Sequence, residues 1–115
     1  MTSRVCIVET ELYLSRAARL MNEVERERVV DLISANPEAG VVIPGTGGLR
    51  KIRIPLQGRG KRGGGRVVYW FYSVNIPIVL LLAFAKNVAG DMTTEERRKL
   101  TALGAVLLEQ LGGKK

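Results

Sequence analysis

Lys51 and Arg53 are the residues of this chain best placed for chemistry. They lie two positions apart in residues 49–54, where basic and hydrophobic residues alternate. Their side chains are therefore expected on the same side of a strand, about 7 Å apart. Arg66 opens the next predicted strand, and Lys86 ends the one after it. Arginine holds a phosphate in a planar two-pronged grip, and lysine supplies a compact charge, so this set predicts a phosphodiester site.

Such a site could cleave RNA with neither histidine nor metal. A lysine crowded by other cations gives up its proton more easily, and it could then accept the proton of a ribose 2′-hydroxyl that attacks its own phosphate. Fixed arginines would stabilise the charge that builds on the phosphate oxygens. The alternative is that these basic residues are exposed and only bind. The chain has no histidine, the commonest metal ligand, and we expect no metal and no cofactor.

The distribution of charge predicts a polyanion as partner. No acidic residue lies between Glu38 and Asp91, whereas the rest of the chain holds ten basic and eleven acidic residues, so the net charge of +7 comes from this middle segment. Its eight basic residues are Arg50, Lys51, Arg53, Arg59, Lys61, Arg62, Arg66 and Lys86. One-signed charge raises the potential over one face and attracts nucleic acid, although a solvated face would also be basic. We predict RNA contacts from Arg50, Arg59, Lys61 and Arg62.

Aromatic residues follow Arg66 and could stack on bases. Alternation along the strand places Trp70 and Tyr72 on one face and Tyr69 and Phe71 on the other, so part of the cluster must be core. We include Tyr72 among the residues that contact RNA.

A single α+β domain over residues 1–115 is expected to position these side chains. Strands are predicted at 4–9, 49–54, 66–73 and 76–85. Helices are predicted at 11–20, from the cap Asn22 to about Ala35, and after the cap Thr93. The order β-α-α-β-β-β-α gives a small twisted, mostly antiparallel sheet of about four strands, with two N-terminal helices and one C-terminal helix. We expect the helices to cover one face and to leave Lys51 and Arg53 on the other.

Composition also limits where the protein works. The longest apolar run, 76–85, contains Pro77 and is half the roughly 20 residues that a membrane span needs. The N-terminal apolar run is short and is followed at once by Glu9 and Glu11, which is unlike a secretory signal. The one cysteine, Cys6, excludes an internal disulfide and is expected to be a small buried residue. These features favour a soluble, cytoplasmic protein without a membrane partner.

The run Pro-Gly-Thr-Gly-Gly-Leu-Arg-Lys-Ile-Arg at 44–53, followed by Gly-Arg-Val-Val-Tyr at 65–69 and Phe-Ala-Lys-Asn at 84–87, carries a resemblance to a known family. The chain resembles the RelE/ParE superfamily of bacterial toxins, most closely its HigB-like branch, over nearly its whole length. The resemblance implies the toxin of a two-gene toxin–antitoxin module. RelE-like members cleave messenger RNA in the ribosomal decoding site and arrest translation, using a strand lysine, nearby basic residues and often an aromatic hydroxyl, with no metal.

Carried over by residue, the resemblance assigns the strand pair of the family to Lys51 and Arg53, and its next-strand arginine to Arg66. Lys86 takes the basic position after the fourth strand, and Tyr69 the tyrosine of the Arg-Val-Val-Tyr motif. Two departures concern the proton donor: Asn87 stands where some members have a basic residue, and Met92-Thr93-Thr94 where they have a tyrosine. Lys86, Tyr69, Tyr72 or a ribosomal group could protonate the leaving oxygen.

Two other functions stay open at this point. A ParE-like toxin would block a protein target such as DNA gyrase, and a non-catalytic module would only bind RNA. The partners expected under the first function are the ribosome, messenger RNA and a cognate antitoxin. An acidic or amphipathic antitoxin segment would cover the basic face and give a hetero-oligomer.

Overall fold

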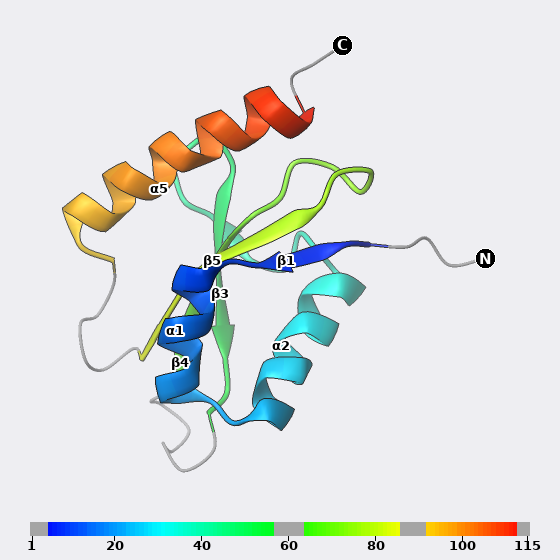
Figure 1. The fold of residues 1–115 in the computed structure, drawn as a ribbon, viewed down its shortest axis with the longest axis vertical. Coiled ribbons are helices and arrows are strands. Elements are labelled where there is room, and N and C mark those ends of the chain that lie inside the picture. The colour runs from blue at the N-terminus through cyan, green and yellow to red at the C-terminus, as the bar shows by residue number, and fades with distance from the viewer. Residues whose placement is uncertain (1–4, 57–63, 86–91, 113–115) are drawn as a thin grey trace.

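The computed structural model describes residues 5–56, 64–85 and 92–112, and they form an α+β structure around one open sheet (Figure 1). The described strands lie in the order β1-β5-β4-β3-β2. Their bounds are Ile7–Glu9 for β1, Val41–Val42 for β2, Leu49–Ile54 for β3, Gly65–Trp70 for β4 and Ile78–Ala85 for β5. Among the described strands, only β1 and β5 pair in parallel. The expectation of an α+β, mostly antiparallel domain is confirmed.

The sheet has five described strands where about four were expected. The additional strand is β2, which comprises two residues between α2 and β3, where no strand was predicted. Val41 and Val42 pair with Lys51 and Arg50 of β3. Two residues are too few to show alternation, so this strand left no pattern in the sequence.

The described residues contain three α-helices, α1 (Glu11–Leu20), α2 (Glu23–Ala35) and α5 (Thr94–Leu107), and the last continues into a π-helical turn, η1 (Leu108–Gly112). α1 and α2 pack on one face of the sheet, and α5 packs on the other (Figure 1). The expectation that all helices cover one face was wrong. α5 lies on the face of Lys51 and Arg53, because Val68 and Trp70 of β4 make that face hydrophobic further along the sheet.

Two hydrophobic cores follow from this arrangement. The core beneath α1 and α2 is built from Tyr13, Ala17, Met21, Val29, Ile33, Ile52, Ile54, Leu56, Val67, Tyr69, Ile78, Leu80 and Ala83. The core beneath α5 is built from Ile43, Leu49, Val68, Trp70, Val79, Leu81, Leu82 and Leu100. β5 is apolar throughout because it supplies side chains to both cores.

Two residues expected in the core are exposed. The helical spacing of Val29, Leu32 and Ile33 predicts that all three lie on the inner face of α2, but Leu32 is 41% exposed, and the buried residues of that helix are Val29 and Ile33. Cys6 is exposed as well. It precedes β1, which lies at the edge of the sheet, so only alternate side chains there face the core.

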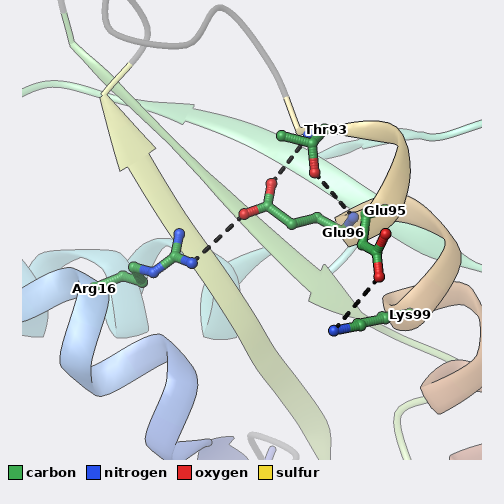
Figure 2. Close-up of polar contacts among 5 residues, drawn as sticks. All are labelled: Arg16, Thr93, Glu95, Glu96 and Lys99. Atoms are coloured by element: carbon green, nitrogen blue, oxygen red, sulfur yellow. Dashed lines mark hydrogen bonds and ion pairs between the residues drawn. The ribbon is translucent and has the colours of Figure 1, made fainter.

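The helix caps predicted from sequence are present. At α2, the Asn22 side chain accepts a hydrogen bond from the Glu25 N–H at 2.8 Å, and the Glu25 carboxylate accepts one from the Asn22 N–H at 2.9 Å. Thr93 and Glu96 repeat the arrangement at α5, with both distances 3.0 Å. Glu96 also pairs with Arg16 of α1 at 3.5 Å across β5 (Figure 2). Glu96 therefore both caps α5 and links it to α1.

Tyr13 of α1 is fully buried, and its hydroxyl makes no hydrogen bond with any described residue. Burial, with a smaller contribution from the negative charge of Glu9, raises the pKa of Tyr13 to about 12.

None of the described helices has the length and hydrophobicity required to cross a membrane.

Replacement of Thr93 by alanine should lower the free energy of unfolding by about 1 kcal/mol, because the Glu96 N–H loses its acceptor at the start of α5. Thr94→Ala is the matched control, since Thr94 is exposed and its hydroxyl makes no hydrogen bond with a described residue. Denaturant unfolding of both variants measures the difference. Equal stability of the two variants would contradict the capping role.

Alkaline pH should destabilise the protein through Tyr13. An unfolded tyrosine loses its proton near pH 10, whereas folded Tyr13 keeps it to about pH 12. The contribution is therefore fully present below pH 10 and is lost as pH rises through 12, a fall of about 2–3 kcal/mol. Tyr13→Phe should flatten the unfolding free energy between pH 10 and 12. An unchanged pH dependence in this variant would contradict the assignment.

Candidate functional site

Lys51, Arg53 and Arg66 project from the same face of the sheet. In β3, Lys51 and Arg53 alternate with Ile52 and Ile54, which enter the core beneath α1 and α2. Arg53 lies directly opposite Arg66 of β4, and directly opposed residues share a face. The structure therefore places these three cations, from two strands, on one face of the sheet.

The register of the two strands fixes the spacing of these side chains. Directly opposed Arg53 and Arg66 have Cβ atoms about 5 Å apart. Lys51 lies opposite Val68, which makes Arg66 its diagonal neighbour at about 7–8 Å. Arg53 is exposed, and Lys51 and Arg66 are partly buried. A phosphate group is small enough to be contacted from these positions at once.

Among the described residues, apolar side chains of β5 lie beside these cations. Phe84 of β5 lies opposite Arg66, and Leu82 lies opposite Val68, so apolar side chains flank the cations on one side. Neither Arg53 nor Arg66 forms an ion pair with a carboxylate of the described residues. The Arg66 guanidinium donates one hydrogen bond, to the carbonyl oxygen of Gly65 at 3.1 Å. Two like charges side by side, with no carboxylate partner in the part of the chain that the structure describes, favour an anionic ligand.

Tyr69, predicted as a catalytic residue, lies on the opposite face of the sheet. It is fully buried in the core beneath α1 and α2. Its hydroxyl donates to the carbonyl oxygen of Pro37 at 2.6 Å and accepts from the N–H of Gly40 at 2.9 Å. Burial raises the pKa of Tyr69, and the hydrogen bond from Gly40 opposes this only in part. The structure thus does not bring Tyr69 together with Lys51.

Arg50, predicted to contact RNA, also lies on the face opposite to Lys51. Its guanidinium donates to the carbonyl oxygens of Gly40 at 2.8 Å and of Glu38 at 3.2 Å, and it lies 5.8 Å from the ring centre of Phe71. Together with Tyr69, Arg50 therefore holds the backbone of 37–40 against the sheet. These hydrogen bonds from Arg50 stabilise the segment that leads into β2.

Tyr72 lies on the face of Lys51 but at some distance along the strand. It is 52% exposed and stacks on buried Trp70, with ring centres 6.2 Å apart and planes 8° from parallel. The partner of Lys51 is Val68, four residues earlier, and α5 packs on the sheet at Trp70. Tyr72 can therefore receive a base, but it is not adjacent to the cations. The other predicted site residues, Arg59, Lys61, Arg62 and Lys86, lie outside the described residues.

Acidic side chains gather on the other side of the molecule. A hollow of about 270 Å³ beside α2 is lined by Glu9, Glu23, Arg26, Glu27, Val30 and Asp31. Arg26 pairs with Glu9 at 3.4 Å. Among the described residues, no group of histidine, cysteine and carboxylate side chains could hold a metal ion.

No family model matches the chain.

The sequence did not indicate the arginines of α5. Arg97 and Arg98 lie outside the acid-free segment and next to Glu95 and Glu96, so they resembled a mixed, solvated helix face. In the fold, Arg97 donates a hydrogen bond to the carbonyl oxygen of Pro44. This contact brings α5 beside the glycine-rich loop 44–48, at the start of β3.

Tyr69→Phe should lower the free energy of unfolding by about 1–3 kcal/mol, because it leaves the Gly40 N–H and the Pro37 carbonyl oxygen without their partner. Tyr13→Phe is the matched control, since it removes a hydroxyl with no hydrogen bond to a described residue. That variant should be as stable as the parent at pH 7, or more so. Thermal and denaturant unfolding measure both, and a Tyr69→Phe protein no less stable than Tyr13→Phe would contradict the bridging role.

Proposed function

We propose that this protein is the toxin of a bacterial toxin–antitoxin module, a ribosome-dependent and metal-independent endoribonuclease that cleaves messenger RNA and arrests translation. The observation that carries the proposal is the shared face of Lys51, Arg53 and Arg66. The family resemblance described above places its functional basic residues at these same positions. The chemistry of the residue types and the resemblance to the family therefore indicate the same position on the sheet, at Lys51, Arg53 and Arg66.

Lys51 is proposed as the general base. It takes the proton of a ribose 2′-hydroxyl, the 2′ oxygen forms a bond to the adjacent phosphorus, and the bond from phosphorus to the 5′ oxygen breaks. The products are a 2′,3′-cyclic phosphate and, once the leaving oxygen has gained a proton, a 5′-hydroxyl end. Arg53 and Arg66 stabilise the additional negative charge on the phosphorus oxygens, which they can do because the strands hold them in place beforehand.

The leaving 5′ oxygen needs a proton donor. Tyr69 is not that donor, because its hydroxyl proton is bonded to the Pro37 carbonyl oxygen on the opposite face. Tyr72 lies beyond the end of β4, four residues past the partner of Lys51. Lys86 and a group of the ribosome are the remaining candidates. A donor supplied by the ribosome would explain ribosome dependence directly, because the site is then complete only in the bound state.

The proposed partners follow from the same charges. The ribosome and messenger RNA present phosphates to the basic face. A cognate antitoxin would neutralise that face with an acidic segment in a hetero-oligomer. The ParE-like alternative, which blocks a protein such as gyrase, requires no base at Lys51 and differs from the proposed function on that point.

Lys51→Ala should reduce cleavage of a translated message by about 100-fold or more, because a general base contributes about 10²–10⁴ in rate. Arg66→Ala should have a comparable effect through loss of charge stabilisation. Primer extension on a message translated by purified ribosomes measures the cuts, and growth arrest on expression measures toxicity. Cuts are expected within codons and only when ribosomes are present.

Lys99→Ala is the matched control, since it removes a lysine charge from α5 that pairs with Glu95 at 3.7 Å, and it should cleave as the parent does. Circular dichroism confirms that each variant folds. Full toxicity of both Lys51→Ala and Arg66→Ala would refute the nuclease. Gyrase inhibition or DNA breaks that survive in Lys51→Ala would support the ParE-like alternative, and salt-sensitive RNA binding without cuts would leave a binding module.

A further inference from the structure

A shallow groove of about 450 Å³ runs between the loop 44–48 and the first turns of α5. Its lining is Gly45, Thr94, Arg97, Arg98, Thr101 and Ala102. Among the described residues that line it, none carries a carboxylate. The groove therefore offers two guanidinium groups, the Thr94 hydroxyl and backbone, while the Thr101 hydroxyl donates to the carbonyl oxygen of Arg97 at 2.7 Å.

The loop wall of the groove is held in one conformation. Thr46 is 1% exposed, and its hydroxyl donates to the carbonyl oxygen of Ile43 at 2.6 Å and accepts from the N–H of Leu49 at 3.3 Å. Gly45 has a φ of 76°, a conformation that disfavours residues with a side chain. Arg97 donates to the Pro44 carbonyl oxygen and ties the loop to α5. The groove is thus formed before any ligand arrives.

The positive charge of the groove is not neutralised within the described residues. Glu95 pairs with Lys99, and Glu96 pairs with Arg16, so the nearest carboxylates of the same helix are directed to other cations (Figure 2). Neither Arg97 nor Arg98 forms an ion pair with a described carboxylate. Arg97 is partly engaged by the loop, whereas the exposed Arg98 guanidinium keeps its donors for a ligand.

We propose that this groove binds the sugar–phosphate backbone of RNA, with Arg98 in direct contact with a phosphate and Arg97 positioning the loop wall. The inference rests on the proposed function, since it supplies a second RNA contact outside the reacting strands. Phosphate oxygens accept hydrogen bonds from guanidinium and hydroxyl groups. The chemistry favours RNA, because two neighbouring guanidinium groups on an open, shallow groove suit an extended backbone of phosphates, and binding of an acidic peptide is an outcome of the test.

The test uses a fluorescent 2′-O-methyl RNA oligonucleotide of about 15 nucleotides, which binds but lacks the attacking hydroxyl. Arg98→Ala should weaken its binding by about threefold to tenfold at low salt. The slope of log affinity against log salt concentration should fall by about 0.7, the value for one phosphate contact on a single strand. Arg98→Glu should weaken binding further. Lys99→Ala, the adjacent charge outside the groove, should leave the slope unchanged.

The outcomes separate this inference from the nuclease itself. If Arg98→Ala and Lys99→Ala lose affinity equally, the effect is general electrostatics and the groove proposal is overturned, whatever the cleavage assay gives. If Arg98→Ala loses affinity for a polyglutamate peptide but not for RNA, the groove binds an acidic peptide instead. If the slope falls in Arg98→Ala alone while the parent protein cleaves no message, the groove stands and the proposed nuclease fails.

Discussion

The register between β3 and β4 is the constraint on which the candidate site depends. It places Arg53 opposite Arg66 and Lys51 opposite Val68. A slip by one residue would move every side chain of one strand to the other face, and the basic residues of β3 would enter the core beneath α1 and α2. Such a slip is prevented by burial on both faces, since Ile52 and Val67 pack on one side and Leu49 and Trp70 on the other. The hydrophobic cores thus position the cations without contacting an RNA ligand.

A second constraint holds the segment around Gly40, which leads into β2, against the sheet beside β3. The Tyr69 hydroxyl and the Arg50 guanidinium bind the backbone around Gly40. A Cβ atom at Gly40 would lie 2.8 Å from the Tyr69 hydroxyl oxygen, so this close approach requires glycine. Immediately afterwards the chain pairs with Lys51 and Arg50 as β2. Tyr69 and Arg50, which sequence reasoning grouped with the site, therefore support the strand that carries Lys51.

The sequence alone predicts most of the helices and strands. It also predicts the face of the sheet on which each residue of β3 lies. Alternation predicted the bounds of β3 and the separation of Lys51 and Arg53 from Ile52 and Ile54, because period-two patterning reflects burial directly. It did not predict on which face α5 would pack. That choice depends on contacts such as Gly104 against Trp70, which join residues far apart in the chain and leave no local pattern.

The same limit explains the errors and the omissions at the site. A motif reports that a residue is present but not where its side chain points, and so Tyr69 and Arg50 were grouped with Lys51 although the sheet separates them. The arginines of α5 lie next to two glutamates in the sequence, so the charge pattern gave no signal for them, whereas the ion pairs direct those glutamates to Arg16 and Lys99. Charge counted along the chain is a poor guide to charge on a surface. Here the fold gathers four carboxylates, those of Glu9, Glu23, Glu27 and Asp31, beside α2, and it places Lys51, Arg53 and Arg66 on the other side of the sheet. This separation would orient the molecule on a polyanion before any specific contact forms.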